Sequence, residues 1–294
     1  MHAKVKPQSN LHIYGVASCQ GAQDRRCDIT PDLLKGTNLA QKLANQGVTA
    51  QWQHIFRMEN PSDRGELVKL FTTLSSAIDE SVSQNTRFAV VGGDHSSAIG
   101  TWSGAAKALK NNGDLGLLWV DAHMDAHTPQ SSPTGALHGM PVACLLGHAT
   151  AELKDIGFSG AKIKPENLCL VGVRSYEAPE LKLLTDLGVK IYYMEDIRRN
   201  GIENVMRSAT DYVRKNTKAF GLSIDMDAFD PVDAPGVGTP AQNGLLASEF
   251  LPVCKELAEN SDFIGAEVVE FNPYRDRNHK TELLIKELIT ALFH

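Results

Sequence analysis

Apolar runs of strand length recur along the whole sequence and alternate with segments of helical periodicity. They are Leu11 to Val16, Phe88 to Val91, Leu115 to Val120, Leu168 to Val173, Val189 to Tyr193, Ala219 to Ile224 and Phe263 to Val269. Several are hydrophobic on both faces, which is typical of strands in a parallel sheet with helices on each side. The sequence therefore predicts the α/β class, with a central parallel sheet.

The helical segments carry ordinary start and stop signals. Thr30 is expected as an N-cap before Pro31, and Gly47 as the end of that helix. Leucine-rich stripes predict further helices over Pro61 to Val82 and Lys280 to Phe293. Because the chain contains no internal repeat and no long Pro/Gly/Ser linker, we expect one domain over residues 1–294.

Charge and composition exclude several classes of function. The net charge of −6 and the pI near 5.9 give no basic patch for a nucleic-acid partner. The first ten residues lack the apolar core of a signal peptide, and no apolar run approaches the length of a membrane span. These features predict a cytoplasmic protein with neither a nucleic-acid nor a membrane partner.

The cysteines do not resemble a disulfide framework or a structural zinc site. There are five, an odd number, they are widely scattered, and none forms a Cys-x-x-Cys pair. We therefore expect most of them to be reduced, as small buried apolar side chains.

Three apolar strands end in Asp and His. The segments are Gly92 to His95, Asp121 to Asp125, and Asp225 to Asp227. Alternate residues of an extended chain point the same way, so Asp121 and His123 share one side, as do Asp225 and Asp227. Each segment alone is more typical of a turn or an N-cap, but their coincidence at strand ends favours a metal site.

The donor set defines the kind of metal. Buried carboxylates without interleaved Lys or Arg need external cations, and four carboxylates balance two divalent ions. Oxygen ligands mixed with two imidazoles favour Mn²⁺, Fe²⁺, Co²⁺, Ni²⁺ or Zn²⁺, and of these we expect Mn²⁺. Two such ions about 3.5 Å apart can share a water and lower its pKa toward neutrality.

At these residues the chain resembles the arginase family, or ureohydrolases. Further motifs that carry the resemblance are Thr134 to Pro141, Gly172 to Ser175, Ala234 to Pro240 and Glu267 to Pro273. The resemblance covers nearly the whole chain and implies a three-layer α/β/α sandwich around an eight-stranded parallel sheet, a fold shared with deacetylases. It also implies two Mn²⁺ per chain and a homotrimer or homohexamer.

The resemblance assigns roles to individual residues. One ion would be held by His95, Asp121, Asp125 and Asp225, and the other by His123, Asp121, Asp225 and Asp227. The catalytic residues would be Asp125, which steadies the nucleophile, His138, which exchanges protons with the leaving amine, and Glu270, which faces the substrate guanidinium. The substrate-binding residues would be His127, Ser132, Thr134, Glu177, Thr239 and Glu270.

The implied activity is hydrolysis of a small guanidinium compound, with L-arginine giving L-ornithine and urea as the first expectation. The chain has His127 and Ala136 where arginases typically have Asn, and Glu177 where they have Asp. Formimidoylglutamase, agmatinase or another amidinohydrolase of the family is therefore the alternative. Two more distant alternatives are a single-zinc amide deacetylase and a degenerate homologue that only binds, although every expected metal ligand is present.

Overall fold

A single parallel sheet organises the molecule, whose computed structural model describes residues 9–60 and 63–294. Its strand order is β2-β1-β3-β8-β7-β4-β5-β6, and all neighbouring strands run parallel. The strands are β1 (Ser9–Ala17), β2 (Val48–Arg57), β3 (Arg87–Val91), β4 (Leu115–Val120), β5 (Leu168–Val173), β6 (Lys190–Tyr193), β7 (Ala219–Asp225) and β8 (Phe263–Val269). The predicted parallel sheet is confirmed, with the eight strands that the resemblance implied.

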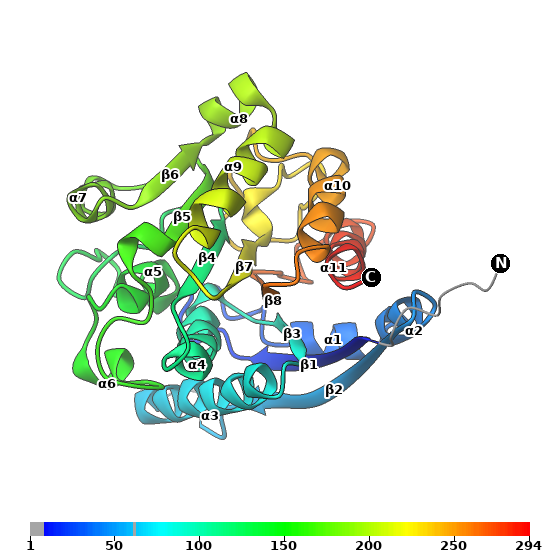
Figure 1. The fold of residues 1–294 in the computed structure, drawn as a ribbon, viewed down its shortest axis with the longest axis horizontal. Helices are drawn as coiled ribbons and strands as arrows, with labels where there is room; N and C mark the ends of the chain where they lie inside the picture. The colour runs from blue at the N-terminus through cyan, green and yellow to red at the C-terminus, as the bar shows by residue number, and fades with distance from the viewer. Residues whose placement is uncertain (1–8, 61–62) are drawn as a thin grey trace.

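Helices cover both faces of this sheet (Figure 1). They are α1 (Thr30–Lys35), α2 (Leu39–Ala44), α3 (Arg64–Ser83), α4 (Ala98–Leu109), α5 (Pro141–Leu145), α6 (Ala151–Lys154), α7 (Ala178–Leu187), α8 (Met194–Asn200), α9 (Ile202–Arg214), α10 (Ala247–Ala258) and α11 (Lys280–Leu292). One hydrophobic cluster joins the sheet to α1, α2 and α8 to α11, and a second joins it to α3 to α7. The fold is therefore the predicted three-layer α/β/α sandwich.

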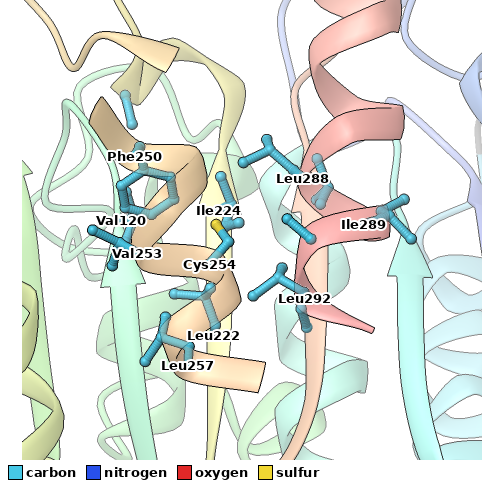
Figure 2. Packing of buried hydrophobic residues seen from close by; sticks show 14 of the residues in the cluster. Val120, Leu222, Ile224, Phe250, Val253, Cys254, Leu257, Leu288, Ile289 and Leu292 are labelled. Atoms are coloured by element: carbon cyan, nitrogen blue, oxygen red, sulfur yellow. The ribbon is translucent and has the colours of Figure 1, made fainter. Parts of the chain in front are cut away.

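The two-sided burial follows from the strand sequences. In β4, Leu118 and Val120 belong to one cluster, while Leu117 and Trp119 belong to the other. In β7, Leu222 and Ile224 pack beneath side chains of α10 and α11 (Figure 2). Burying one such aliphatic side chain stabilises the fold by about 1.5–3 kcal/mol. The central strands are thus rigid supports for whatever follows their carboxyl ends.

Two sequence predictions on helices and strands need correction. Thr30 is the first residue of α1 rather than its cap, because its hydroxyl donates to the carbonyl of Phe271, and the expected helix divides into α1 and α2 around Gly36. Strand β2 has no apolar run because it is an edge strand, paired only with β1, and most of its side chains are partly or fully exposed. The helices expected near residues 61–82 and 280–293 are confirmed as α3 and α11, with residues 61–62 outside the described part of the chain.

Most of the cysteines are free, as predicted, but one pair is bonded. Cys19 and Cys27 form a disulfide, with Cα atoms 5.8 Å apart, because the chain after β1 turns back on itself. The other cysteines, Cys144, Cys169 and Cys254, are buried and free as expected. Burial raises the pKa of the Cys144 and Cys169 thiols to about 12, so both remain protonated and unreactive.

Candidate metal centre and substrate pocket

The sheet brings the three Asp/His segments together. Strands β3, β8, β7 and β4 are neighbours in that order, and their carboxyl ends lie at the same edge. His95 follows β3, Asp121 follows β4, Asp225 is the last residue of β7, and Glu270 follows β8. Residues far apart in the sequence therefore converge on one region.

The first group of possible metal ligands contains His95, Asp121, Asp125 and Asp225, all buried. His95 Nδ1 lies 3.2 Å from Asp121 Oδ2, 3.1 Å from Asp125 Oδ2 and 3.1 Å from Asp225 Oδ2. These are the members expected for one ion. Four donors converging at this spacing form a site that can hold a cation.

The orientation of the His95 ring is fixed by contacts with Trp119 and Ser223. Its plane stacks on Trp119 with ring centroids 4.1 Å apart, and its Nε2 lies 3.0 Å from the Ser223 hydroxyl. Ser223 in turn contacts the buried carboxylate of Glu267 at 3.2 Å. Because Nε2 is engaged there, Nδ1 is the nitrogen directed at the carboxylates.

The second group contains Asp121, His123 and Asp227. His123 Nδ1 lies 3.2 Å from Asp227 Oδ2 and 3.6 Å from Asp121 Oδ1. Thr239 donates to Asp227 Oδ2 over 2.9 Å. Asp121 thus belongs to both groups, whereas Asp225, expected in both, lies only in the first.

Two residues of the site hold an unusual backbone conformation. Asp125 has φ +48° and Glu270 has φ +65°, in the left-handed region that non-glycine residues rarely adopt. Such conformations cost on the order of 1 kcal/mol and persist where surrounding contacts impose them. Here the contacts include the amide of Glu270, which donates to the Gly93 carbonyl over 2.7 Å.

The electrostatics of the first group favour added positive charge. Burial, with the charges of Asp227 and Asp121, raises the pKa of Asp225 well above its usual value. Burial and the charge of Asp121 raise the pKa of Asp125 to about 7. Within residues 9–60 and 63–294, the only ion-pair partners of the four carboxylates are histidines. The donor set therefore fits divalent cations, and oxygen with imidazole suits first-row transition ions.

A cavity of about 310 Å³ opens above these groups. The predicted residues that line it are His123, Asp125, His127, Ser132, Thr134, His138, Glu177, Asp225, Asp227 and Thr239. His95, Asp121 and Glu270 are not among the lining residues. The structure thus brings the predicted substrate-binding side chains, other than Glu270, around one cavity with metal-ligand candidates at its base.

Glu270, which is buried, pairs with His138, which is half-buried and lines the cavity. Glu270 Oε1 lies 3.0 Å from His138 Nδ1 and accepts a hydrogen bond from the amide of His95 over 2.9 Å. Burial opposes the charge on His138, but the hydrogen bond and charge of Glu270 outweigh it and raise the pKa of His138 to about 9. His138 is therefore protonated at neutral pH.

The outer wall contains a second cluster that the sequence revealed only in part. His127 Nε2 contacts Glu177 Oε2 and lies 3.6 Å from Glu180 Oε2. Its other nitrogen lies 3.1 Å from the Ser131 hydroxyl. Glu180 was missed, although Glu177 and Glu180 form a capping box at the start of α7 whose spacing is visible in the sequence.

Arg174 was also missed as an individual residue. Its guanidinium donates to the backbone carbonyls of Gly172, Asp227, Ala241 and Gln242. It therefore joins the end of β5 to Asp227, two residues after β7, and to the loop after Thr239.

The molecule is an α/β protein whose parallel sheet gathers His and Asp donors at its strand ends, in groups that could hold metal ions. The family model described as "Arginase family" matches residues 9–294. The chain is 42% identical over 220 residues to an arginase of Bacillus caldovelox, covering 75% of this chain and 73% of the relative. It is 34% identical to an arginase of Brevibacillus brevis, covering 97% of each chain.

Solved structures agree with these relatives. A crystal structure of arginase from Bacillus subtilis superposes with a TM-score of 0.91 at 33% identity, over 97% of this chain and 98% of that one. The chain belongs to the arginase family. This confirms the family inferred from the motifs and its class of metal-dependent hydrolase. Within the described residues, no helix is long and apolar enough to cross a membrane.

Proposed function

We propose that this protein is an arginase that hydrolyses L-arginine to L-ornithine and urea and holds two Mn²⁺ per chain. The observation that carries the proposal is the placement of two His/Asp groups at the base of a cavity whose wall contains His138. Similarity to relatives named arginase over almost the whole chain supports the same substrate.

The two groups of donors would hold the cations. His95 and Asp125 belong to one site, His123 and Asp227 to the other, and Asp121 is common to both. Asp225 completes the first site, and we propose that it also reaches the second. Bound there, two cations would lower the pKa of a shared water toward neutrality.

Three residues of the chain would act on the substrate. Glu270 offers a carboxylate to the planar guanidinium cation, a pairing that matches its N–H donors. Asp125, at the base of the cavity, accepts a hydrogen bond from the attacking water. In the metal-free protein the hydrogen bond and charge of Glu270 raise the pKa of His138 to about 9, and we propose that this imidazole donates a proton to the departing amine, a role typically worth 10²–10⁴-fold in rate.

The outer wall would recognise the amino-acid head group. An α-ammonium fits Glu177, and an α-carboxylate fits the hydrogen-bond donors of His127, Ser132 and Thr134, all of which line the cavity. Thr239 would act from the other side, where its hydroxyl steadies Asp227. In the structure His127 Nε2 contacts Glu177, and we propose that it donates to the α-carboxylate, in place of the usual Asn, when Glu177 pairs with the α-ammonium.

A substrate panel tests the proposal. The purified manganese form is incubated with L-arginine, agmatine or N-formimidoyl-L-glutamate, and urea, formamide and ammonia are measured. We expect urea from L-arginine with the highest kcat/KM. Urea only from agmatine, or formamide only from the formimidoyl substrate, would refute the arginase assignment in favour of another family activity. A matched control, Thr72→Ala on the exposed side of α3, should leave kcat/KM unchanged, whereas His138→Asn should lower it at least about 100-fold.

We also propose one domain over residues 1–294, a cytoplasmic location, and a homotrimer or homohexamer. The continuous sheet, covered by a hydrophobic cluster on each face, supports a single folding unit. Light scattering of the purified protein measures the oligomer, and a monomeric mass would contradict that part of the proposal.

A further inference from the structure

The segment after β1, residues 18–28, has no helix or strand and is closed by the Cys19–Cys27 disulfide. We name it the 18–28 loop. Both cysteines are buried, whereas Gln23, Arg25 and Arg26 between them are exposed. A loop with so little regular structure is ordered at a cost in conformational entropy, and a covalent closure reduces that cost.

The 18–28 loop lies against the segment that carries His95. The Gly21 amide donates to Asp94 Oδ2 over 2.8 Å, and the Asp94 amide donates to the Ser18 carbonyl over 3.2 Å. A Cβ on Gly21 would lie 2.6 Å from the hydroxyl oxygen of Ser96, so the two segments are in close contact. The loop is therefore part of the wall of the site.

The same loop holds the backbone of His138. The His138 amide donates to the Gly21 carbonyl over 3.1 Å. Gln23, two residues further on, lines the cavity. Gly21 thus uses its amide and its carbonyl to join the segments of Asp94 and His138.

A third contact reaches the segment after Glu270. Asp24 Oδ2 lies 3.1 Å from Asn272 Nδ2 and 3.1 Å from Arg275 Nη2. The loop therefore contacts both the segment that carries His138 and the segment that follows Glu270. Among the described residues, hydrogen bonds and an ion pair join Gly21 and Asp24 to the site. The Cys19–Cys27 disulfide is a covalent link within the loop, and Gly21 and Asp24 lie between its two cysteines.

We propose that the Cys19–Cys27 disulfide positions His138, and that its reduction loosens the 18–28 loop and slows turnover at the site. In the reduction, a dithiol supplies two electrons and two protons, the S–S bond breaks, two cysteine thiols form, and the dithiol becomes a cyclic disulfide. Disulfides in a reducing compartment are usually transient or regulatory. The effect on turnover rests on the function proposed above, whereas the effect on His138 does not.

Thiol counting tests the bond itself. The protein prepared without reductant and then denatured should show three free thiols, and five after reduction by a phosphine. The phosphine takes the oxygen of one water and becomes a phosphine oxide as the two thiols form. Five thiols before reduction would overturn the proposal.

Hydrogen exchange tests the positioning independently of any substrate. Reduction should speed exchange of the Gly21 and His138 amides by at least about tenfold, because both depend on the loop. The amide of Trp119, inside β4, should not change. Equal exchange of the His138 amide in both states would overturn the inference that the disulfide positions this residue.

Kinetics of the manganese form test the consequence. Reduction should lower kcat about tenfold, as expected for a displaced proton donor, and change KM less than about twofold. The double variant Cys19→Ser/Cys27→Ser should reproduce the reduced kcat and no longer respond to phosphine. The control Arg25→Ser, an exposed position in the same loop, should keep both full kcat and the response.

The possible outcomes separate the two proposals. If the double variant fails to fold, the phosphine-reduced native protein still provides the comparison. An unchanged kcat after complete reduction would overturn the effect on turnover. If no substrate of the panel is hydrolysed in either state, the proposed function fails, and the exchange of the His138 amide still decides whether the disulfide positions that residue.

Discussion

Replacing His138 by glutamine removes a positive charge from a half-buried side chain and leaves a hydrogen-bond donor beside the buried carboxylate of Glu270. In the metal-free protein, burial disfavours the charged imidazole, yet the Glu270 hydrogen bond and charge raise the pKa of His138 to about 9. The unfolded chain binds the same proton with a pKa near the ordinary 6.5. Proton binding by His138 therefore stabilises the folded state.

The size of this effect follows from the two pKa values. Their difference corresponds to about 3 kcal/mol, fully present below about pH 6.5 and lost as the pH rises through about 9. The His138 side chain is only 22% exposed, so solvent screens the pair little. For a chain of this length, about 3 kcal/mol corresponds to a shift of about 5 °C in Tm.

Thermal unfolding of the chelated protein at about pH 6 and about pH 9.5 measures the stabilisation that the His138 proton contributes. The difference in Tm between native protein and His138→Gln should be about 5 °C larger at the lower pH. Groups that do not contact His138 titrate alike in both proteins, so the difference reports on His138 and the carboxylates that interact with it, chiefly Glu270 and Asp94. Glu270→Gln should abolish the same pH dependence, and the double variant should add little to either single variant. A Tm difference independent of pH would refute this reasoning.

Three further predictions concern the core, the loop wall and the ligands. Leu222→Ala should lower the free energy of unfolding by about 2–5 kcal/mol in denaturant titrations, because Leu222 is fully buried beneath α10 and α11; a loss below about 1 kcal/mol would contradict the packing. Gly93→Ala places a Cβ 1.9 Å from the Ser18 carbonyl oxygen, so faster proteolysis of the 18–28 loop is expected, and unchanged protection would argue against that contact. Asp121→Asn alters a ligand candidate common to both groups, so metal analysis should find fewer than two ions per chain, while an unchanged content would exclude Asp121 as a bridge.

The central sheet could be predicted because its strands are buried on both faces. In β4 and β7 every residue is buried, and such strands require continuous apolar runs. Strand β2 could not be found this way, because an edge strand with one neighbour tolerates residues such as Gln51 and Gln53. The break between α1 and α2 likewise depends on tertiary contacts such as that of Thr30 with Phe271.

The convergence of the metal-ligand candidates could also be predicted from the sequence, because burial again constrains which residues are tolerated. Buried carboxylates at strand ends, such as Asp121 and Asp225, are costly without cations, so their presence in an apolar context is informative. His138 and Glu270 carry no such signal, and their roles came from family resemblance and remain proposals.

The disulfide was beyond the reach of sequence reasoning. Whether Cys19 meets Cys27 depends on the path of the loop after β1. That path is determined by hydrogen bonds between Gly21 and two residues distant in the sequence, Asp94 and His138.

The central claim is that this chain holds a pair of cations between its Asp and His side chains. X-ray diffraction from crystals grown with Mn²⁺, collected above and below the manganese absorption edge, tests it most directly. The account predicts two anomalous peaks per chain, one near His95 and Asp125 and one near His123 and Asp227. If crystals of protein that still hydrolyses its substrate show a single peak, or no peak at these side chains, the claim of a cation pair is contradicted.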